Sequence, residues 1–154
     1  LLKKKINLGN KNYYYKQCFY KPYLPFNFSK HMYKFASSSI DISDGLVKDV
    51  KSLCKSSKCG AELHYSKLPF SKNTQKLIND AKIKSINIFS KGDDYQILFT
   101  SHKKNRKLVE KIGKLTSTKI SMIGQVKRRR IVKIYNGNKI IKLFGAKTGY
   151  IHSF

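Results

Sequence analysis

The stretch "SSSIDISDGLVKD", residues 37–49, contains the clearest fold signal in the chain. Its first half, residues 37–42, alternates enough between polar and apolar side chains to indicate the end of a β-strand. Its second half opens an apolar repeat at helical spacing, formed by Leu46, Val50, Leu53 and Cys54. We therefore predict a strand that turns directly into an amphipathic helix over residues 44–58, with Gly60 as its C-terminal stop.

Two of the chain's eight acidic residues, Asp41 and Asp44, lie in the turn of this stretch. Together with the hydroxyl of Ser43 they place hard oxygen ligands above the N-terminus of the predicted helix. Mg²⁺ prefers such oxygens while it bridges to substrate phosphates, and a helix N-terminus favours a phosphate at the same place. The pattern therefore suits a Mg–nucleotide site, although a plain helix cap, with Asp44 as the capping residue, explains it as well.

A second acidic motif, "KGDDYQ", occupies residues 91–96 and leads into a strand that we predict over residues 94–100. In an extended segment Asp93 and Asp94 point to opposite sides, so one can face a ligand while the other bonds to the backbone. Such a carboxylate suits a cationic group on a ligand. An acidic turn before a strand is the alternative interpretation.

The rest of the chain alternates between helical and extended patterns. Residues 1–35 are predicted to be irregular, with an extended connector and a short helix. After the helix at residues 44–58 we predict a strand at 61–65, helices at 71–81 and 104–114, a strand at 119–126 and a hairpin at 128–144. Ser71 can cap its helix, and Asn136–Gly137 is a type I′ turn signal for the hairpin. The order β-α-β-α-β-α-β-β-β predicts an α+β fold in α/β/α layers, with helices on a mixed sheet.

Composition limits the classes of partner. The 154 residues have a formal net charge of +25, and the positive side chains are nearly all lysines spread over every segment. A specific RNA surface would be expected to use arginine and stacking aromatics, so we do not expect nucleic acid as the main partner. No apolar run approaches the roughly 18 residues of a membrane helix, and the three cysteines fit no metal or secreted pattern. These features indicate a cytoplasmic protein without membrane contact.

The two acidic motifs, taken with their neighbours, resemble a known family. In order along the chain, "ASSSIDISDGLVKDVKSLCKSSKCGAEL", "LPFS", "KGDDYQILFT", "IGQV" and "GYIHSF" are similar to the C-terminal half of thiamine-monophosphate kinase, from about residue 17 onward. This family lies in the aminoimidazole-ribonucleotide synthetase superfamily, whose C-terminal domain has ferredoxin-like character. The resemblance implies an enzyme that makes thiamine diphosphate from thiamine monophosphate and ATP, with Mg²⁺.

The resemblance also implies roles for single residues. Asp41 and Asp44 would ligate Mg²⁺, and Ser43 would contact ATP. Asp93 stands where the family has an acid that contacts thiamine monophosphate. No catalytic residue is assigned. Two aromatic residues near the end of the chain are candidates to pack on the substrate, Tyr150 and Phe154.

In terms of domains, the resemblance implies that residues 1–35 connect to a missing N-terminal domain and residues 36–154 form the C-terminal kinase domain. We expect this fragment to be inactive alone and the full-length protein to be a homodimer through its N-terminal domain. Lys91 and Gln96 depart from the family pattern, which has a glycine and an acid there. Two alternatives stay open: another superfamily member, such as a selenophosphate synthetase or a hydrogenase-maturation relative, and a small basic RNA-binding module.

Overall fold

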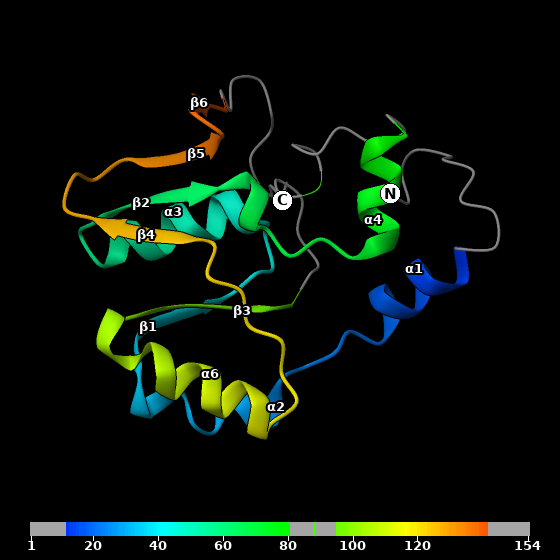
Figure 1. The fold of residues 1–154 in the computed structure, drawn as a ribbon, viewed down its shortest axis with the longest axis horizontal. Coiled ribbons are helices and arrows are strands. Elements are labelled where there is room, and N and C mark those ends of the chain that lie inside the picture. Colours follow the sequence, from blue (N-terminus) through cyan, green and yellow to red (C-terminus); the bar gives the residue numbers. More distant parts are fainter. Residues whose placement is uncertain (1–11, 81–87, 89–94, 142–154) are drawn as a thin grey trace, which may run out of the picture.

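The computed structural model describes residues 12–80, 88 and 95–141 of the chain. These residues form two β-sheets with helices packed on them (Figure 1). The helices are α1 (Asn12–Tyr20), α2 (Phe26–Ser29), η2 (Met32–Lys34), α3 (Leu46–Ser56), η3 (Tyr65–Lys67), α4 (Lys72–Asn79), η4 (Lys103–Asn105) and α6 (Arg106–Leu115). The strands are β1 (Ala36–Asp41), β2 (Gly60–His64), β3 (Ile97–Ser101), β4 (Gly124–Lys127), β5 (Val132–Asn136) and β6 (Lys139–Ile140).

The larger sheet has the strand order β4-β2-β5-β6. Strand β2 is antiparallel to β4 and parallel to β5, and β5 is antiparallel to β6, so the sheet is mixed. Gly60 leaves no room for a side chain, because an added Cβ would lie 2.1 Å from the carbonyl oxygen of Arg129. The β5–β6 turn contains Gly137 at φ +56°, a conformation that glycine adopts without steric cost.

The smaller sheet pairs β1 with β3 in antiparallel register, so that Ile40 lies opposite Leu98 and Asp41 opposite Ile97. Within this pair the hydroxyls of Ser38 and Thr100 lie 2.7 Å apart and form a cross-strand hydrogen bond. Helix α3 contacts both β1 and β2, so it connects the two sheets and follows directly on the end of β1.

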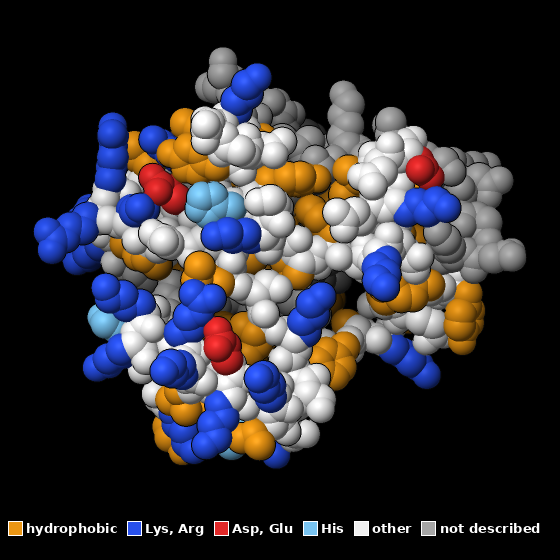
Figure 2. Space-filling model, viewed as in Figure 1, with side chains coloured by type: hydrophobic (Ala, Val, Ile, Leu, Met, Phe, Trp, Pro, Cys, Tyr) orange, Lys and Arg blue, Asp and Glu red, His pale blue; other side chains and the backbone are white. Residues whose placement is uncertain are grey.

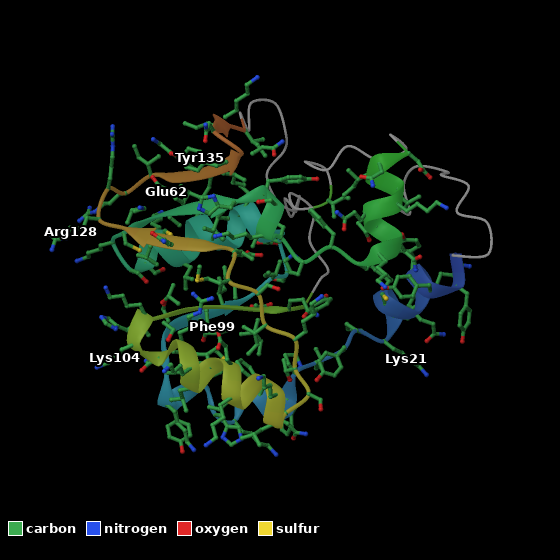
Figure 3. The ribbon with its side chains drawn as sticks, viewed as in Figure 1. Lys21, Glu62, Phe99, Lys104, Arg128 and Tyr135 are labelled. Atoms are coloured by element: carbon green, nitrogen blue, oxygen red, sulfur yellow. The ribbon has the colours of Figure 1, made fainter. Side chains whose placement is uncertain are left out.

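Two hydrophobic clusters hold these layers together. The larger one joins α3 to the four-stranded sheet, and its buried members are Leu46, Val47, Val50, Cys54, Ala61, Leu63, Leu68 and Ile134. The smaller one covers the β1–β3 pair with α2 and α6, and its buried members are Phe28, Phe35, Val109 and Ile112. Phe99 of β3 packs on it, with its ring centre 5.8 Å from that of Phe28 and 5.5 Å from that of Phe35 (Figure 3). Each such fully buried side chain contributes about 1.5–3 kcal/mol.

The predicted fold class is confirmed, because the structure combines helices with a mixed sheet. Ser71 caps α4 as expected, since its hydroxyl accepts a hydrogen bond from the Thr74 N–H at 3.1 Å. The predicted hairpin is present as β5 and β6 around Gly137. Its predicted end, beyond residue 141, lies outside the described residues.

Three predictions about single elements were wrong. Residues 12–20 form helix α1 and are not irregular; their aromatic residues, at 13–15 and 19–20, do not follow a helical period. Residues 119–123 are not part of a strand, because Ile120 instead packs on α6, where a Cβ at Gly113 would meet its Cδ1 at 2.6 Å. Gly60 begins β2 and does not end α3; the left-handed position after that helix belongs to Lys58, at φ 52°.

In the described ranges, no helix has both the length and the apolar character that crossing a lipid bilayer requires.

Candidate functional site

The turn after β1 is joined by backbone hydrogen bonds to Tyr95 and Gln96, the described end of the second acidic motif. Beyond Asp41, the Ile42 N–H donates to the carbonyl oxygen of Gln96 at 2.8 Å. The Tyr95 N–H in turn donates to the carbonyl oxygen of Ile42 at 2.9 Å. Tyr95 and Gln96 belong to "KGDDYQ", so these bonds hold the turn after β1 beside the second motif.

Asp41 and Ser43 are the residues before and after Ile42 in the chain. Strand β1 alternates half-buried and exposed residues, and Asp41 is an exposed residue at its end. Ser43 is half-buried in the turn between β1 and α3. The carboxylate and the hydroxyl are thus both accessible from solvent at the end of β1.

Asp44 is half-buried and pairs with a cation on its own helix. Its Oδ2 lies 2.8 Å from Nζ of Lys48, one turn further along α3. The two side chains are 31% and 36% exposed respectively, and partly exposed ion pairs of this kind contribute roughly 0–1 kcal/mol. The carboxylate is therefore able to exchange this partner for another cation at low cost.

Asp49 is the group that stabilises the turn, and the sequence analysis did not single it out. Its Oδ2 accepts hydrogen bonds from the backbone N–H groups of Asp44, at 3.1 Å, and Gly45, at 3.0 Å. The side chain is only 3% exposed. Burial raises the pKa of the Asp49 carboxyl, the two hydrogen bonds oppose that rise, and the charges of Asp44 and Asp41 add to it.

This geometry excludes one interpretation of the turn, in which Asp44 caps the helix. The N-cap of α3 is Gly45, with no side-chain cap of its own, and Asp49 supplies the acceptor. The interpretation of Asp44 as the capping residue is therefore wrong, and its carboxylate is left for other contacts. Gly45 is required here because its φ of 113° is a conformation that residues with a Cβ rarely adopt.

The N-terminus of α3 also offers backbone donors. The first intrahelical hydrogen bond runs from the Asp49 N–H to the carbonyl oxygen of Gly45, at 3.0 Å. The amides of the preceding helical residues consequently have no acceptor within the helix, which is the usual basis of anion binding at a helix start. Carboxylates and amides at one turn suit a ligand that combines a cation with phosphates.

The described carboxylates do not by themselves make up a complete set of metal ligands. Over residues 12–80 and 95–141 there is no group of three or more His, Cys, Asp or Glu side chains that could hold a metal ion. Mg²⁺ is commonly held by only one or two carboxylates, with waters and substrate phosphates completing its shell. Asp41 and Asp44 therefore fit this role, provided that a nucleotide supplies further oxygens.

Three predicted site residues, Asp93, Tyr150 and Phe154, lie outside the described residues. Conversely, the structure adds Tyr95, whose φ of 50° is unusual for a residue with a Cβ. Backbone strain of this kind costs of order 1 kcal/mol or more and often accompanies functional sites.

The sequence did contain a signal for Asp49. Asp49 lies three residues after Leu46 and four before Leu53, which places it on the apolar stripe of the helix. A carboxylate on a buried stripe must find hydrogen-bond donors.

Comparison with known proteins identifies what this chain is similar to. No family model matches the sequence. A thiamine-monophosphate kinase from Buchnera aphidicola subsp. Schizaphis graminum is 36% identical over 121 residues, which are 76% of this chain and 36% of the relative. The resemblance seen in the acidic motifs is thereby confirmed for the aligned part of the chain.

Solved structures agree with this result. The structure of AaThiL complexed with AMPPCP and TMP matches 90% of this chain and 43% of the solved chain, with a TM-score of 0.69 and 26% identity. Escherichia coli HypE, a hydrogenase maturation protein, superposes on 79% of this chain, over 40% of the HypE chain, with a TM-score of 0.63. At 14% sequence identity this similarity shows a common fold alone. The chain spans less than half the length of each of these proteins.

Proposed function

We propose that this chain forms the C-terminal part of an ATP-dependent kinase that phosphorylates thiamine monophosphate to thiamine diphosphate. The similar kinase sequences and the AaThiL complex with AMPPCP and TMP support this function. The observation that carries it is the backbone pairing of Ile42 with Tyr95 and Gln96, because it holds two acidic motifs together at the start of α3. In this proposal residues 36–154 form the kinase domain and residues 1–35 the connector to an N-terminal domain.

The nucleotide side of the site is assigned to the turn after β1. Asp41 and Asp44 would ligate Mg²⁺, and Ser43 would contact ATP. When bound, Mg²⁺ would neutralise phosphate charge during phosphoryl transfer. The first-turn amides of α3 would orient the phosphates, and Lys48, 2.8 Å from Asp44, would be close enough to add positive charge beside them.

The reaction needs little proton chemistry from the protein. The terminal phosphoryl group of ATP would pass to a phosphate oxygen of thiamine monophosphate, so that its bond to the ADP oxygen breaks as the new P–O bond forms. The acceptor oxygen is already anionic near neutral pH, and therefore no general base is required. Positioning and charge neutralisation remain as the main tasks of the protein.

The thiamine side of the site is assigned to residues outside the described ranges. Asp93 would face the cationic thiazolium, and Tyr150 or Phe154 would pack on the ring, since a cation is stabilised by a carboxylate and by an aromatic face. For the complete protein we propose a cytoplasmic homodimer whose dimer contacts lie in the N-terminal domain.

A chimera tests the proposal. This chain would replace the corresponding C-terminal region of the Escherichia coli thiamine-monophosphate kinase, and thiamine diphosphate would be quantified by chromatography after incubation with ATP, Mg²⁺ and thiamine monophosphate. We expect the chimera to form product and the 154-residue chain alone to form none. Omission of Mg²⁺ should abolish formation of the product.

A binding measurement on this chain keeps the test decisive if the two parts of the chimera do not dock. Mn²⁺, a paramagnetic substitute for Mg²⁺, should broaden the amide NMR signals of Asp41, Ser43 and Asp44 in the presence of AMPPCP. A folded, soluble chimera without kinase activity, together with unchanged amide signals, would reject the proposed function.

A further inference from the structure

Asp49 is the one buried charged residue among those that the structure describes, at 3% exposure. Taking a carboxylate out of water costs several kcal/mol unless hydrogen bonds replace its solvation. Both of its hydrogen bonds come from the turn that contains the proposed metal ligands, from the N–H groups of Asp44 and Gly45. The residue is thus connected to the site and not only to its own helix.

The two bonds restrain the backbone on both sides of Asp44. The Asp44 N–H belongs to the peptide plane that precedes its Cα, and the Gly45 N–H belongs to the plane that follows it. One oxygen atom, Oδ2 of Asp49, accepts from both, at 3.1 and 3.0 Å. With both planes held, the direction of the Cα–Cβ bond of Asp44 is set, and only side-chain rotation remains free.

The packing of α3 makes this restraint rigid. Val47 and Val50, on either side of Asp49, are 0% and 3% exposed, and they belong to the core between α3 and the four-stranded sheet. Asp49 therefore connects the buried face of α3 to a turn whose Asp44 side chain is 31% exposed.

We propose that Asp49 is a positioning residue for the metal site, fixing Asp44 through its backbone in the orientation in which the Asp44 carboxylate binds Mg²⁺. This inference rests on the proposed function, because it assumes that Asp44 is a metal ligand. Outer groups that orient metal ligands typically change metal affinity by about 10-fold to 100-fold when they are altered.

Two conservative variants separate position from charge. Asp49→Asn removes the charge but keeps an acceptor oxygen at the same distance from the backbone. Asp49→Glu keeps the charge but moves the acceptor by one methylene. If Asp49 acts by position, Asp49→Glu should weaken Mn²⁺ binding by about tenfold or more, while Asp49→Asn should stay within about threefold of the unchanged chain.

A third variant controls for loss of stability. Val50→Ala removes core packing from the next residue of α3 without touching the turn, so it should lower the unfolding temperature and leave Mn²⁺ affinity unchanged. Mn²⁺ affinity would be measured on the 154-residue chain, with AMPPCP present, by titration of the Asp44 amide signal, and unfolding would be followed by circular dichroism.

The outcomes are distinguishable. Equal Mn²⁺ affinity in Asp49→Glu and the unchanged chain would overturn the positioning role, as would a loss in Asp49→Asn that exceeds the loss in Asp49→Glu. A comparable loss in Val50→Ala would reduce the role of Asp49 to general stability. If the unchanged chain itself does not bind Mn²⁺ at Asp44, the metal assignment of the proposed function fails and the inference fails with it.

Discussion

The two ends of helix α3 carry opposite charge and are built in different ways. At its start, a buried carboxylate, Asp49, restrains the turn that presents Asp44. Beyond its other end, Gly60 at the start of β2 packs on the loop between β4 and β5. In this loop Arg128, labelled in Figure 3, is exposed, and so are Arg129 and Arg130. Three of the chain's four arginines thus lie in one loop, yet nothing in the described structure restrains their guanidinium groups.

The comparison shows that charge alone does not make a site in this protein. Figure 2 shows Lys and Arg side chains scattered over the described part of the viewed face, so a further cluster of them adds little distinct field. Salt also screens exposed charges. The scarce acidic residues differ from the lysines and arginines in their setting. Asp41 and Asp44 lie at the start of a helix whose dipole favours a nearby anion, and hydrogen bonds to Asp49 hold the backbone there. Fixed geometry, and not the number of charges, distinguishes the acidic end.

The largest expected effect concerns the thiol of Cys54, near the C-terminal end of α3. Burial, with the neighbouring Cys59, raises the pKa of Cys54 to about 11, whereas a thiolate-activating site would lower it. On the order of one Cys54 in a thousand is then ionised at pH 8, and reactivity should rise as the pH approaches 11. We expect iodoacetamide at pH 8 to modify the exposed Cys18 first and Cys54 only after unfolding, as followed by mass spectrometry. Rapid labelling of Cys54 in the folded chain would show that the basic end does activate a nucleophile.

The next largest effect is expected on kinase activity when Asp44, just before the start of α3, is changed. Asp44→Asn should remove most of the kinase activity of the chimera, by about tenfold or more in kcat/KM, because a neutral amide is a poor ligand for Mg²⁺. Arg129→Gln, at the other end of α3, is the matched control and should leave kcat/KM unchanged. Steady-state kinetics over a range of Mg²⁺ concentrations measure both. Normal turnover of Asp44→Asn at ordinary Mg²⁺ would reject the metal role.

Two glycine variants separate the effect of backbone strain on stability from its effect on metal binding. Gly45 and Gly137 both have positive φ, 113° and 56°, so replacement by alanine should destabilise the fold by roughly 1–2 kcal/mol in each case. Only Gly45→Ala should also weaken Mn²⁺ binding, since Gly137 lies at the β5–β6 turn with nothing within 4 Å of an added Cβ. Urea denaturation and Mn²⁺ titration check the pair. Equal Mn²⁺ affinity in both variants would mean that the turn geometry does not matter.

The smallest effect concerns the cation that pairs with Asp44. Lys48→Met should raise Mn²⁺ affinity by at most about fivefold, because the ammonium group competes with the metal for the Asp44 carboxylate and such a pair contributes roughly 0–1 kcal/mol. Lys51→Met removes the same charge from an exposed position of α3 and controls for the general field. A fall in Mn²⁺ affinity in Lys48→Met would show that Lys48 does not compete with the metal for the Asp44 carboxylate.

Much of the fold could be predicted because its signals are local. The apolar stripe from Leu46 to Cys54 predicted α3, and the dipeptide Asn136–Gly137 predicted the hairpin. The error at residues 119–123 arose because packing on a neighbouring helix decides the conformation there. Ile120 leaves the expected strand because Gly113 of α6 offers it a contact without a Cβ.

The candidate site divides in the same way. The two acidic motifs were visible along the chain because acidic residues are scarce elsewhere in it, and the family resemblance came from the order of the motifs. Their backbone pairing was not predicted. That Asp44 is not the helix cap could not be predicted, because Ser, Asp and Gly at a strand–helix junction fit several caps equally well.

By itself the sequence determined most of the elements, the α+β class, the two acidic motifs and the resemblance to thiamine-monophosphate kinase, since periodicity and residue order are properties of the chain alone. Only the tertiary structure decided which carboxylate serves the helix and which serves the turn. Burial is set by packing, and once α3 lies on the sheet with Asp49 beneath the turn, that carboxylate must take the backbone donors and Asp44 is left at the surface.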